Sequence, residues 1–422
     1  MHTFKDLGLS PDIMKALKNL NFTEPTPIQY EAIPIALEGN DVLGTAQTGS
    51  GKTAAFVIPM IEQLAKTKNK SGIILTPTRE LAEQVSNVVK LFLGYRNPIS
   101  SVSLIGGEGI YGQINQLKRD PRIVIGTPGR INDHLERGTL KLDKCEYVVL
   151  DETDRMLDMG FGIQVNRILK FIPKNRQTLL FSATLPPPIL KLSSKYLNNP
   201  IRVSIKDNDV LEVNIKQHVI NVHQNDKLKE LIKVINSREG TILIFVKTKY
   251  GTEKLSKKLQ EEGLKSTALH GGLRQNKRSK IMKNYRDQRF RILIATDIAS
   301  RGLDVPHIET VINHDLPQAP EDFIHRIGRT ARAGSVGEAV SFVTPNDRRI
   351  WSLIQKLLGI DNKDNNEKSK GSNNKSKGSN NINSKKKYRP NSNNRYNKTR
   401  SKSKSNSNRD FKGNYKKRSS GA

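Results

Sequence analysis

Short apolar segments of strand length recur along the chain and alternate with longer, more polar stretches that suit helices. The first series covers residues 41–44, 72–76, 122–126, 147–150 and 178–181, and the second covers 241–246, 291–295 and 310–313. The apolar residues within these segments are continuous rather than alternating, which indicates strands buried on both faces of a sheet. Helical stretches between such strands predict an α/β fold built on parallel sheets.

A polar segment separates the two series of strands. It begins shortly after Pro200 and includes Lys, Asp and Asn at residues 206–209. We therefore predict one α/β domain at residues 1–205 and a second at 214–360, joined by a linker at 206–213. Residues 361–422 follow as a separate C-terminal segment.

The composition adds a large positive charge to this picture. The 422 residues include 71 Lys and Arg against 41 Asp and Glu, for a net charge of +30. Such an excess favours a polyanionic partner, although a Lys- and Asn-rich composition inherited from the genome would also produce it. The single cysteine excludes an internal disulfide, and no apolar run approaches the roughly 20 residues of a membrane helix. We expect a soluble cytoplasmic protein with no membrane contact.

The C-terminal segment carries half of this excess charge. Residues 361–422 contain 19 Lys and Arg against 4 Asp and Glu, and the heptapeptide KSKGSNN occurs twice in tandem at 368–381. Too little apolar surface is present to offset chain entropy, so we predict a disordered tail. Basic residues with a few interleaved aromatic residues suit RNA, and the tail is expected to add RNA affinity. A merely solubilising tail is the alternative.

A glycine-rich segment follows the predicted strand at 41–44 and precedes a helical stretch. Its residues are Ala46, Gln47, Thr48, Gly49, Ser50, Gly51, Lys52 and Thr53. The two glycines let the backbone curl so that N–H groups point at phosphate oxygens, and the next helix presents its positive end to them. Lys52 suits the β- and γ-phosphates, and the Thr53 hydroxyl suits Mg²⁺. Ala46 replaces the usual first glycine, and a chance glycine loop is the alternative.

An acidic pair completes the pattern of a nucleotide hydrolase. Asp151 and Glu152 follow the predicted strand at 147–150. Asp151 would hold Mg²⁺, and Glu152 would orient the attacking water as a base. Acidic residues after a strand are often ordinary loop residues, but Lys52 in the same predicted sheet makes that interpretation weak.

Further motifs occur in an order that resembles the DEAD-box RNA helicases. The acidic segment 151–154 reads DETD, and residues 182–184 read SAT. The others are NFTEPTPIQ at 21–29 with Phe4 upstream, PTREL at 77–81, GG at 106–107, TPGR at 127–130, HG at 270–271, ATDIASRGLD at 295–304 and HRIGRTAR at 325–332. The resemblance covers about residues 1–350, and the segment 155–161 is most similar to the bacterial RhlE-like branch. It implies two RecA-like domains in tandem.

The resemblance implies an ATP site with contributions from both domains. The implied ATP contacts outside residues 46–53 are Phe4, Phe22, Gln29, Asp304, Arg329 and Arg332. Gln29 would read adenine while Phe4 stacks on it, so ATP should be preferred to GTP.

The implied catalytic roles extend to the second domain. Arg329 and Arg332 would act as arginine fingers, which contribute about 10³–10⁵ in rate. His325 would link them to the acidic motif and to Ser182 and Thr184, which couple hydrolysis to unwinding.

The resemblance also implies a set of RNA contacts, most of which are small or basic residues. They are Pro77, Thr78, Arg79, Gly106, Gly107, Thr127, Pro128, Gly129, Arg130, Gln275, Arg278 and Thr296. Hydroxyls, N–H groups and arginines suit phosphate oxygens and 2′-OH groups, so we expect recognition of the RNA backbone without a sequence preference.

Two residues depart from the family pattern. Thr153 replaces the Ala of DEAD, and Asn21 replaces the usual Gly before Phe22. Neither change removes a group that the chemistry requires, although Thr153 could alter the coupling to Ser182 and Thr184.

The sequence therefore predicts an ATP-dependent RNA helicase that separates short duplexes or remodels ribonucleoproteins locally. Ribosome assembly and RNA turnover are the processes expected by analogy, with ribosomal or RNA-decay proteins as partners. The alternatives are an ATP-gated RNA clamp with little unwinding, a DNA-directed helicase of the same superfamily, and an annealing chaperone that depends on the tail.

Overall fold

The computed structural model describes residues 3–46, 49–94, 97–205, 215–300, 305, 307–331 and 336–360. The chain divides into two units, Met1–Asn362 and Lys363–Ala422, and the description below concerns the first. The predicted linker and tail lie outside the described residues, as do Gln47, Thr48, Asp304 and Arg332.

The first sheet holds seven strands in the part of the chain that is described, and each pairing is parallel. They are β1 (Val42–Thr45), β2 (Ser71–Leu75), β3 (Ser101–Leu104), β4 (Ile123–Gly126), β5 (Cys145–Leu150), β6 (Gln177–Ser182) and β7 (Ile201–Ser204). Their spatial order is β3-β4-β2-β5-β6-β1-β7. The accompanying helices are η1 (Phe4–Leu7), α1 (Pro11–Asn19), α2 (Pro27–Leu37), α3 (Lys52–Ala65), α4 (Arg79–Leu93), α5 (Ile110–Leu117), α6 (Pro128–Glu136), α7 (Thr153–Asp158), α8 (Gly162–Leu169) and α9 (Pro187–Tyr196).

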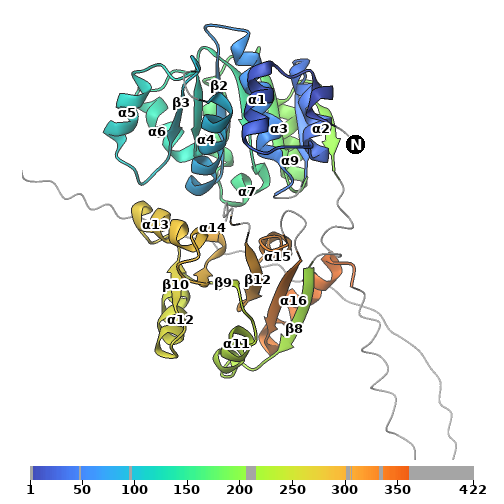
Figure 1. Cartoon of the computed structure of the whole chain (residues 1–422), viewed down its shortest axis with the longest axis vertical. Helices are drawn as coiled ribbons and strands as arrows, with labels where there is room; N and C mark the ends of the chain where they lie inside the picture. Colours follow the sequence, from blue (N-terminus) through green and yellow to red (C-terminus); the bar gives the residue numbers. More distant parts are fainter. Residues whose placement is uncertain are drawn as a thin grey trace, which may run out of the picture. The chain divides into compact units, whose positions relative to one another are not determined.

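The second sheet holds six described strands, again with parallel pairings (Figure 1). They are β8 (Ile215–Asn221), β9 (Thr241–Phe245), β10 (Ser266–Leu269), β11 (Ile292–Ala295), β12 (Ile308–Asn313) and β13 (Gly337–Val343), in the order β10-β11-β9-β12-β13-β8. The accompanying helices are α11 (Lys227–Asn236), α12 (Lys249–Glu261), α13 (Gln275–Arg286), α14 (Asp297–Ser300), α15 (Pro320–Ile327), η2 (Pro345–Asp347) and α16 (Arg348–Leu357).

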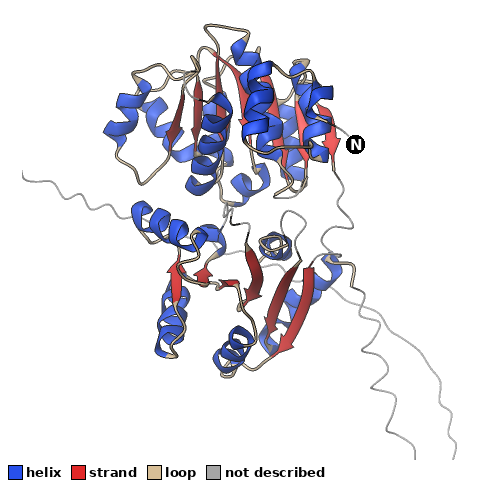
Figure 2. Cartoon of the chain, in the orientation of Figure 1, coloured by secondary structure: helices blue, strands red, loops and turns tan. Residues whose placement is uncertain are grey.

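Each sheet is covered by helices and separates two hydrophobic cores (Figure 2). In β2, Ile74 packs into one core and Ile73 into the other. In β9, Ile244 and Leu243 divide in the same way. Because successive strand residues point to opposite faces, a sheet with a core on both faces needs continuous apolar strands. The predicted parallel α/β fold is confirmed.

The strands that the hydrophobic pattern did not predict are mainly those at the sheet edges. β3, β7, β8 and β10 are edge strands, and β13 lies next to β8. Polar or exposed residues interrupt each edge strand, as in the exposed stretch of β8 that follows Ile215. An edge strand pairs on one side and is partly open to solvent, so it does not need a continuous apolar run. Among the described residues, no helix is long and apolar enough to cross a membrane.

Candidate functional site

The order of strands in the first sheet divides its carboxyl edge into two neighbouring regions. β5, β6 and β1 are adjacent and lead into the acidic pair, the SAT segment and the glycine-rich loop. β3, β4 and β2 are also adjacent and lead into the GG, TPGR and PTREL segments. Carboxyl ends of parallel strands are the usual place for ligand sites in α/β folds. The candidate nucleotide residues and the candidate RNA residues thus occupy separate parts of one edge.

The glycine-rich loop has the backbone that phosphate binding requires. Gly49 and Gly51 both have φ of 91°, in the left-handed region that favours glycine. A Cβ added at Gly51 would lie 2.5 Å from Nε2 of Gln29 and 2.8 Å from the hydroxyl oxygen of Thr26. The helix α3 starts at Lys52, so the N–H groups of its first turn face the loop.

Lys52 is buried beside the acidic pair. Its ammonium donates a hydrogen bond to the carbonyl of Ala46. Burial lowers the pKa of Lys52, while the charges of Asp151 and Glu152 act in the opposite direction. The buried ammonium has lost its water and is stabilised instead by two carboxylates and a carbonyl. A phosphate oxygen is suited to replace the Ala46 carbonyl as its hydrogen-bond acceptor.

Gln29 contacts the phosphate loop rather than solvent. Its Oε1 accepts from the backbone N–H of Thr26 at 3.0 Å, and its Nε2 donates to the carbonyl of Gly51 at 3.0 Å. The predicted adenine-reading residue is therefore tied to the glycine-rich loop. Phe4 is buried in the adjacent hydrophobic core, whereas Phe22 is partly exposed and stacks on Phe92 with ring centroids 6.2 Å apart.

The acidic pair lies at the end of β5 and is almost inaccessible to solvent. Burial, followed by repulsion from Glu152, raises the pKa of Asp151 to about 7, and Lys52 opposes this shift. Glu152 has φ of 47° and lies 3.5 Å from the guanidinium of Arg155. Two buried carboxylates beside one lysine form a site that a divalent cation would neutralise.

The last residue of the DETD segment joins the acidic motif to the SAT segment. Oδ2 of Asp154 accepts from the backbone N–H groups of Ala183 and Thr184, at 3.0 Å each. The hydroxyl of Ser182 accepts from the N–H of Asp154 at 3.3 Å and donates to the carbonyl of Thr184 at 2.7 Å. Ser182 and Thr184 are therefore brought together with the acidic motif.

The unusual Thr153 makes no contribution to this junction. Its buried hydroxyl donates to the carbonyl of Leu150 at 3.2 Å, within its own segment. The change from Ala is accommodated because the added hydroxyl has a local acceptor.

In the second sheet, the strand order again gathers distant motifs. Arg326 on α15 makes a two-pronged ion pair with Asp297, at 2.6 and 2.8 Å, and lies over the ring of Phe245 at 4.8 Å from its centroid. Arg329 is buried nearby, and Arg155, His325, Arg326 and Arg329 line a common small cavity. The other two second-sheet ATP residues, Asp304 and Arg332, lie outside the described residues.

The candidate RNA residues of the first sheet converge on a cavity of about 420 Å³. Its lining includes Pro77, Thr78, Arg79, Gly106, Thr127, Gly129 and Arg130, together with Gly271 and Arg278. Gly107 has φ of 84°, and a Cβ there would lie 2.4 Å from the Arg79 guanidinium. The absence of a side chain at Gly107 thus permits close approach of the Arg79 guanidinium.

Glu80 is a functional candidate that the motif analysis did not single out. Its carboxylate accepts from Arg278 at 2.7 Å, and both side chains are buried. Gln275 accepts from Arg79 at 3.3 Å. Thr296 is buried after β11. Glu80 belongs to the PTREL motif, but only the tertiary structure reveals its contact with Arg278, which lies far away in the sequence.

Comparisons with known proteins agree with this geometry. A family model described as DEAD/DEAH box helicase matches residues 26–192, and one described as Helicase conserved C-terminal domain matches residues 224–334. The chain is 42% identical over 349 residues to "DEAD-box ATP-dependent RNA helicase CshA" of Geobacillus kaustophilus, which covers 82% of this chain and 74% of that protein. It is 42% identical over 358 residues to "ATP-dependent RNA helicase CshA" of Listeria monocytogenes, with 84% and 69% covered.

Solved structures give the same result. The structure of S. cerevisiae Dbp5 bound to RNA and ADP BeF3 matches with a TM-score of 0.78 at 34% identity, over 86% of this chain and 94% of that one. The structure of Mss116p bound to ssRNA and AMP-PNP matches with a TM-score of 0.78 at 31% identity, over 85% and 77%. The fold is a pair of RecA-like α/β domains.

The curated relatives reported above carry the name CshA, and placement in the RhlE-like branch stays a prediction. The motifs, their arrangement and the extent of the similarity all point to one family. The chain belongs to the DEAD-box ATP-dependent RNA helicases, which are ATP hydrolases.

Proposed function

We propose that RNA-stimulated ATP hydrolysis by this chain drives local, non-processive separation of short RNA duplexes. The observation that carries this proposal is the junction between Asp154 and the SAT segment. Residues adjacent to the hydrolytic pair are hydrogen-bonded to a segment at the end of the neighbouring strand. A change in charge at the phosphate site is therefore expected to shift the backbone of residues 183–184 through the carboxylate of Asp154.

The hydrolytic step would use four residues of the first RecA-like domain. Lys52 neutralises the β- and γ-phosphates, and Glu152 accepts the proton of the attacking water. Asp151 and the Thr53 hydroxyl form a hard-oxygen donor set that fits Mg²⁺. Burial, followed by repulsion from Glu152, raises the pKa of Asp151, and a bound cation would favour its charged form. When bound, Mg²⁺ supplies charge stabilisation to the phosphates.

The second RecA-like domain would complete the ATP site. Arg329 and Arg332 serve as arginine fingers, with His325 beside them, and Asp304 contacts the ribose. Phe4, Phe22 and Gln29 hold the adenine ring and favour ATP over GTP. The contact of Gln29 with Gly51 supports this role, because adenine recognition is then tied to the phosphate loop.

RNA would be bound through its backbone. The cavity at the ends of β2, β3 and β4 presents hydroxyls, close-approach glycines and arginine side chains, a set that suits phosphate and 2′-OH groups. Gln275, Arg278 and Thr296 would extend the same path.

The basic tail at 361–422 would add RNA affinity. We place the domain limits at 1–205 and 214–360. A cytoplasmic role in ribosome assembly or RNA turnover, with ribosomal or RNA-decay proteins as partners, is proposed by analogy alone.

The test of this function is the substitution Glu152→Gln. It removes the proposed base while keeping the size of a buried side chain, and we expect RNA-stimulated ATP turnover to fall by about 10²–10⁴-fold. The matched control is Glu136→Gln, which alters an exposed glutamate on α6. Wild-type turnover in Glu152→Gln would contradict the assignment.

A strand-displacement assay separates the proposal from its alternatives. Release of a fluorescent strand from a short RNA duplex should require hydrolysable ATP. ATP-dependent binding and turnover without release would indicate an RNA clamp. Equal turnover with DNA and RNA would indicate a DNA-directed enzyme, and annealing without ATP by the tail alone would indicate a chaperone.

A further inference from the structure

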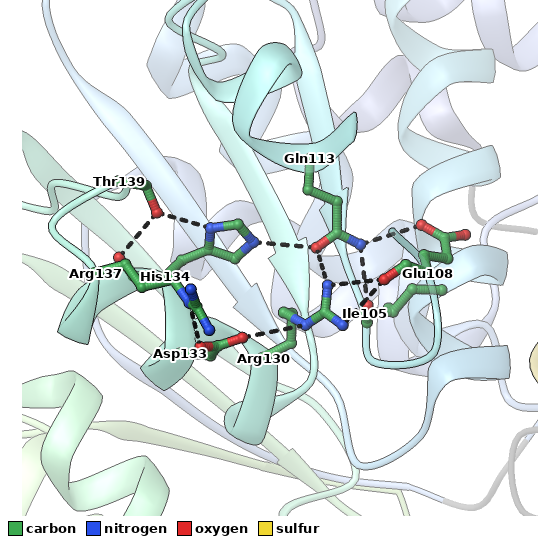
Figure 3. A network of polar contacts seen from close by, with 8 residues as sticks. All are labelled: Ile105, Glu108, Gln113, Arg130, Asp133, His134, Arg137 and Thr139. Carbon is green, nitrogen blue, oxygen red and sulfur yellow. Dashed lines mark hydrogen bonds and ion pairs between the residues drawn. The ribbon is translucent and has the colours of Figure 1, made fainter. Parts of the chain in front are cut away.

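A buried polar network lies behind the GG and TPGR segments, and apart from Arg130 none of its side chains has a role assigned above (Figure 3). Gln113 on α5 is 2% exposed and His134 on α6 is 0% exposed. Figure 3 shows the amide of Gln113 between the imidazole of His134 and the guanidinium of Arg130. Polar side chains buried this deeply are costly unless each group has a partner.

Gln113 uses its whole hydrogen-bonding capacity. Its Nε2 donates to the carbonyl of Ile105 at 3.0 Å and to the carboxylate of Glu108 at 3.1 Å. Its Oε1 accepts from Nη1 of Arg130 at 2.8 Å and faces Nε2 of His134 at 3.1 Å. The amide orientation is therefore fixed, because a flipped amide would point its donors at a guanidinium and its oxygen at a carbonyl.

The protonation of His134 follows from these partners. Since Oε1 of Gln113 can only accept, Nε2 of His134 carries a proton and donates. Nδ1 then faces the hydroxyl oxygen of Thr139 at 2.9 Å, and that hydroxyl also lies 3.1 Å from the carbonyl of His134, so its single hydrogen serves one acceptor at a time. Burial, together with the charges of Arg130 and Arg137, lowers the pKa of His134, and Asp133 acts against this. The neutral imidazole therefore orients the Gln113 amide from behind.

Arg130 is held at two points by this arrangement. Both of its terminal nitrogens donate to the carbonyl of Glu108, at 3.3 and 3.2 Å, in addition to the bond with Gln113. Its Nε also lies 3.8 Å from the carboxylate of Asp133. The loop at 105–108, which contains the glycine pair, and the arginine of TPGR are thus joined directly through the Glu108 carbonyl and again through the Gln113 amide.

We propose that Gln113 is a positioning residue for RNA binding, which fixes the Arg130 guanidinium against the glycine-pair loop and is itself oriented by His134. This inference rests on the proposed contact of Arg130 and Gly106–Gly107 with the RNA backbone. A guanidinium left to rotate would lose conformational entropy on binding a phosphate, whereas one held by Gln113 and Glu108 has already lost it.

The first experiment measures affinity for a fluorescent single-stranded oligoribonucleotide in the presence of ADP and beryllium fluoride. Gln113→Met keeps the side-chain length but removes all four bonds. We expect the Kd for RNA and the RNA concentration for half-maximal ATPase to rise about five- to tenfold, as for loss of roughly one strong hydrogen bond. Turnover at saturating RNA should change by less than about twofold. The matched control is Gln116→Met, on the exposed face of the same helix.

The second experiment uses His134. His134→Leu removes the donor that faces Gln113, whereas His134→Gln can place an amide N–H near the position of Nε2 and should restore at least half of the lost affinity. A purely structural role would lower the thermal unfolding midpoint of the full chain without this recovery in RNA affinity. If Gln113→Met does not fold, the His134 pair tests the same inference.

A double-substitution cycle separates the inference from the function on which it rests. If Gln113 acts through Arg130, Gln113→Met should weaken RNA binding by less than about twofold further in an Arg130→Met background. Additive losses would overturn the positioning role. An Arg130→Met protein with wild-type RNA affinity would overturn the proposed RNA contact itself. Normal Arg130 dependence with no effect of Gln113→Met would overturn only the present inference.

Discussion

Backbone strain in the described residues marks two of the predicted catalytic segments. Glu152 has φ of 47° and Ala331 has φ of 54°, both in the left-handed region that residues other than glycine rarely adopt. Glu152 is the predicted base, and Ala331 lies two positions after the predicted finger Arg329. Such strain costs about 1–3 kcal/mol and persists where the surrounding structure determines it. At Glu152 it turns the side chain out of the path of β5 immediately after Asp151.

The DETD segment permits a sharp comparison between neighbouring residues. Thr153→Ala removes only a local hydrogen bond to Leu150, so ATP turnover and strand release should stay within about twofold of the wild type. Asp154→Asn replaces the carboxylate that holds residues 183–184, and strand release should fall about tenfold or more, with a smaller effect on ATP turnover. Parallel measurement of turnover and strand release in both variants checks this. Equal losses in the two variants would contradict the assignment of coupling to Asp154.

At the scale of elements, both sheets use the same device after a central strand. Thr78 follows β2 as the N-cap residue of α4, and its hydroxyl accepts from the N–H of Leu81 at 3.2 Å. Thr248 follows β9 as the N-cap residue of α12, and its hydroxyl accepts from the N–H of Gly251 at 3.0 Å. Each cap satisfies a free N–H group and typically contributes about 1 kcal/mol. The repeated strand, threonine cap and helix show that the two domains are built on one local plan.

Helix α6 should make the first domain sensitive to acid. The folded-state pKa of His134 is lowered, so it lies below the unfolded value of about 6.5. The unfolded chain then binds more protons as the pH falls through about 6.5, and stability is lost in that direction. The raised pKa of Asp151 acts in the opposite sense over this range, so the expectation concerns a difference between proteins. The free energy of unfolding in urea of the wild type, relative to that of His134→Gln, should fall between about pH 7.5 and about pH 5.5. An equal decrease in both proteins would show that other groups dominate.

At the scale of the whole molecule, charge is divided between the described body and the tail. Residues 361–422 contain 19 basic and 4 acidic side chains, which give half of the net charge of +30. The cavity proposed for RNA at the edge of the first sheet is lined by residues of the described part of the chain. The two parts are therefore expected to contribute to RNA binding in different ways.

Removal of residues 361–422 should weaken RNA binding without disabling the enzyme. Fewer cations then release fewer counterions, so the slope of log affinity against log salt should become shallower. ATP turnover at saturating RNA should stay within about twofold, because the hydrolytic residues lie before residue 333. Anisotropy titrations at several salt concentrations, with full-length chain as the control, measure both effects. An unchanged slope would leave the tail without an electrostatic role.

The parallel α/β class, the order of the motifs and the residue types suited to phosphate could all be predicted from the amino-acid sequence. Continuous apolar strands and glycine, lysine and acidic motifs are local signals, legible without knowledge of what lies opposite. Tertiary structure alone decided which of these segments meet. The spatial order β3-β4-β2-β5-β6-β1 places the candidate RNA-binding residues and the candidate nucleotide-binding residues at separate parts of one sheet edge. This order cannot be derived from the order of the strands along the chain. Asp154 contacts residues 183–184, and Gln113 contacts Arg130. These contacts join segments that are distant in the sequence or that carry no motif, so only the packed structure reveals them.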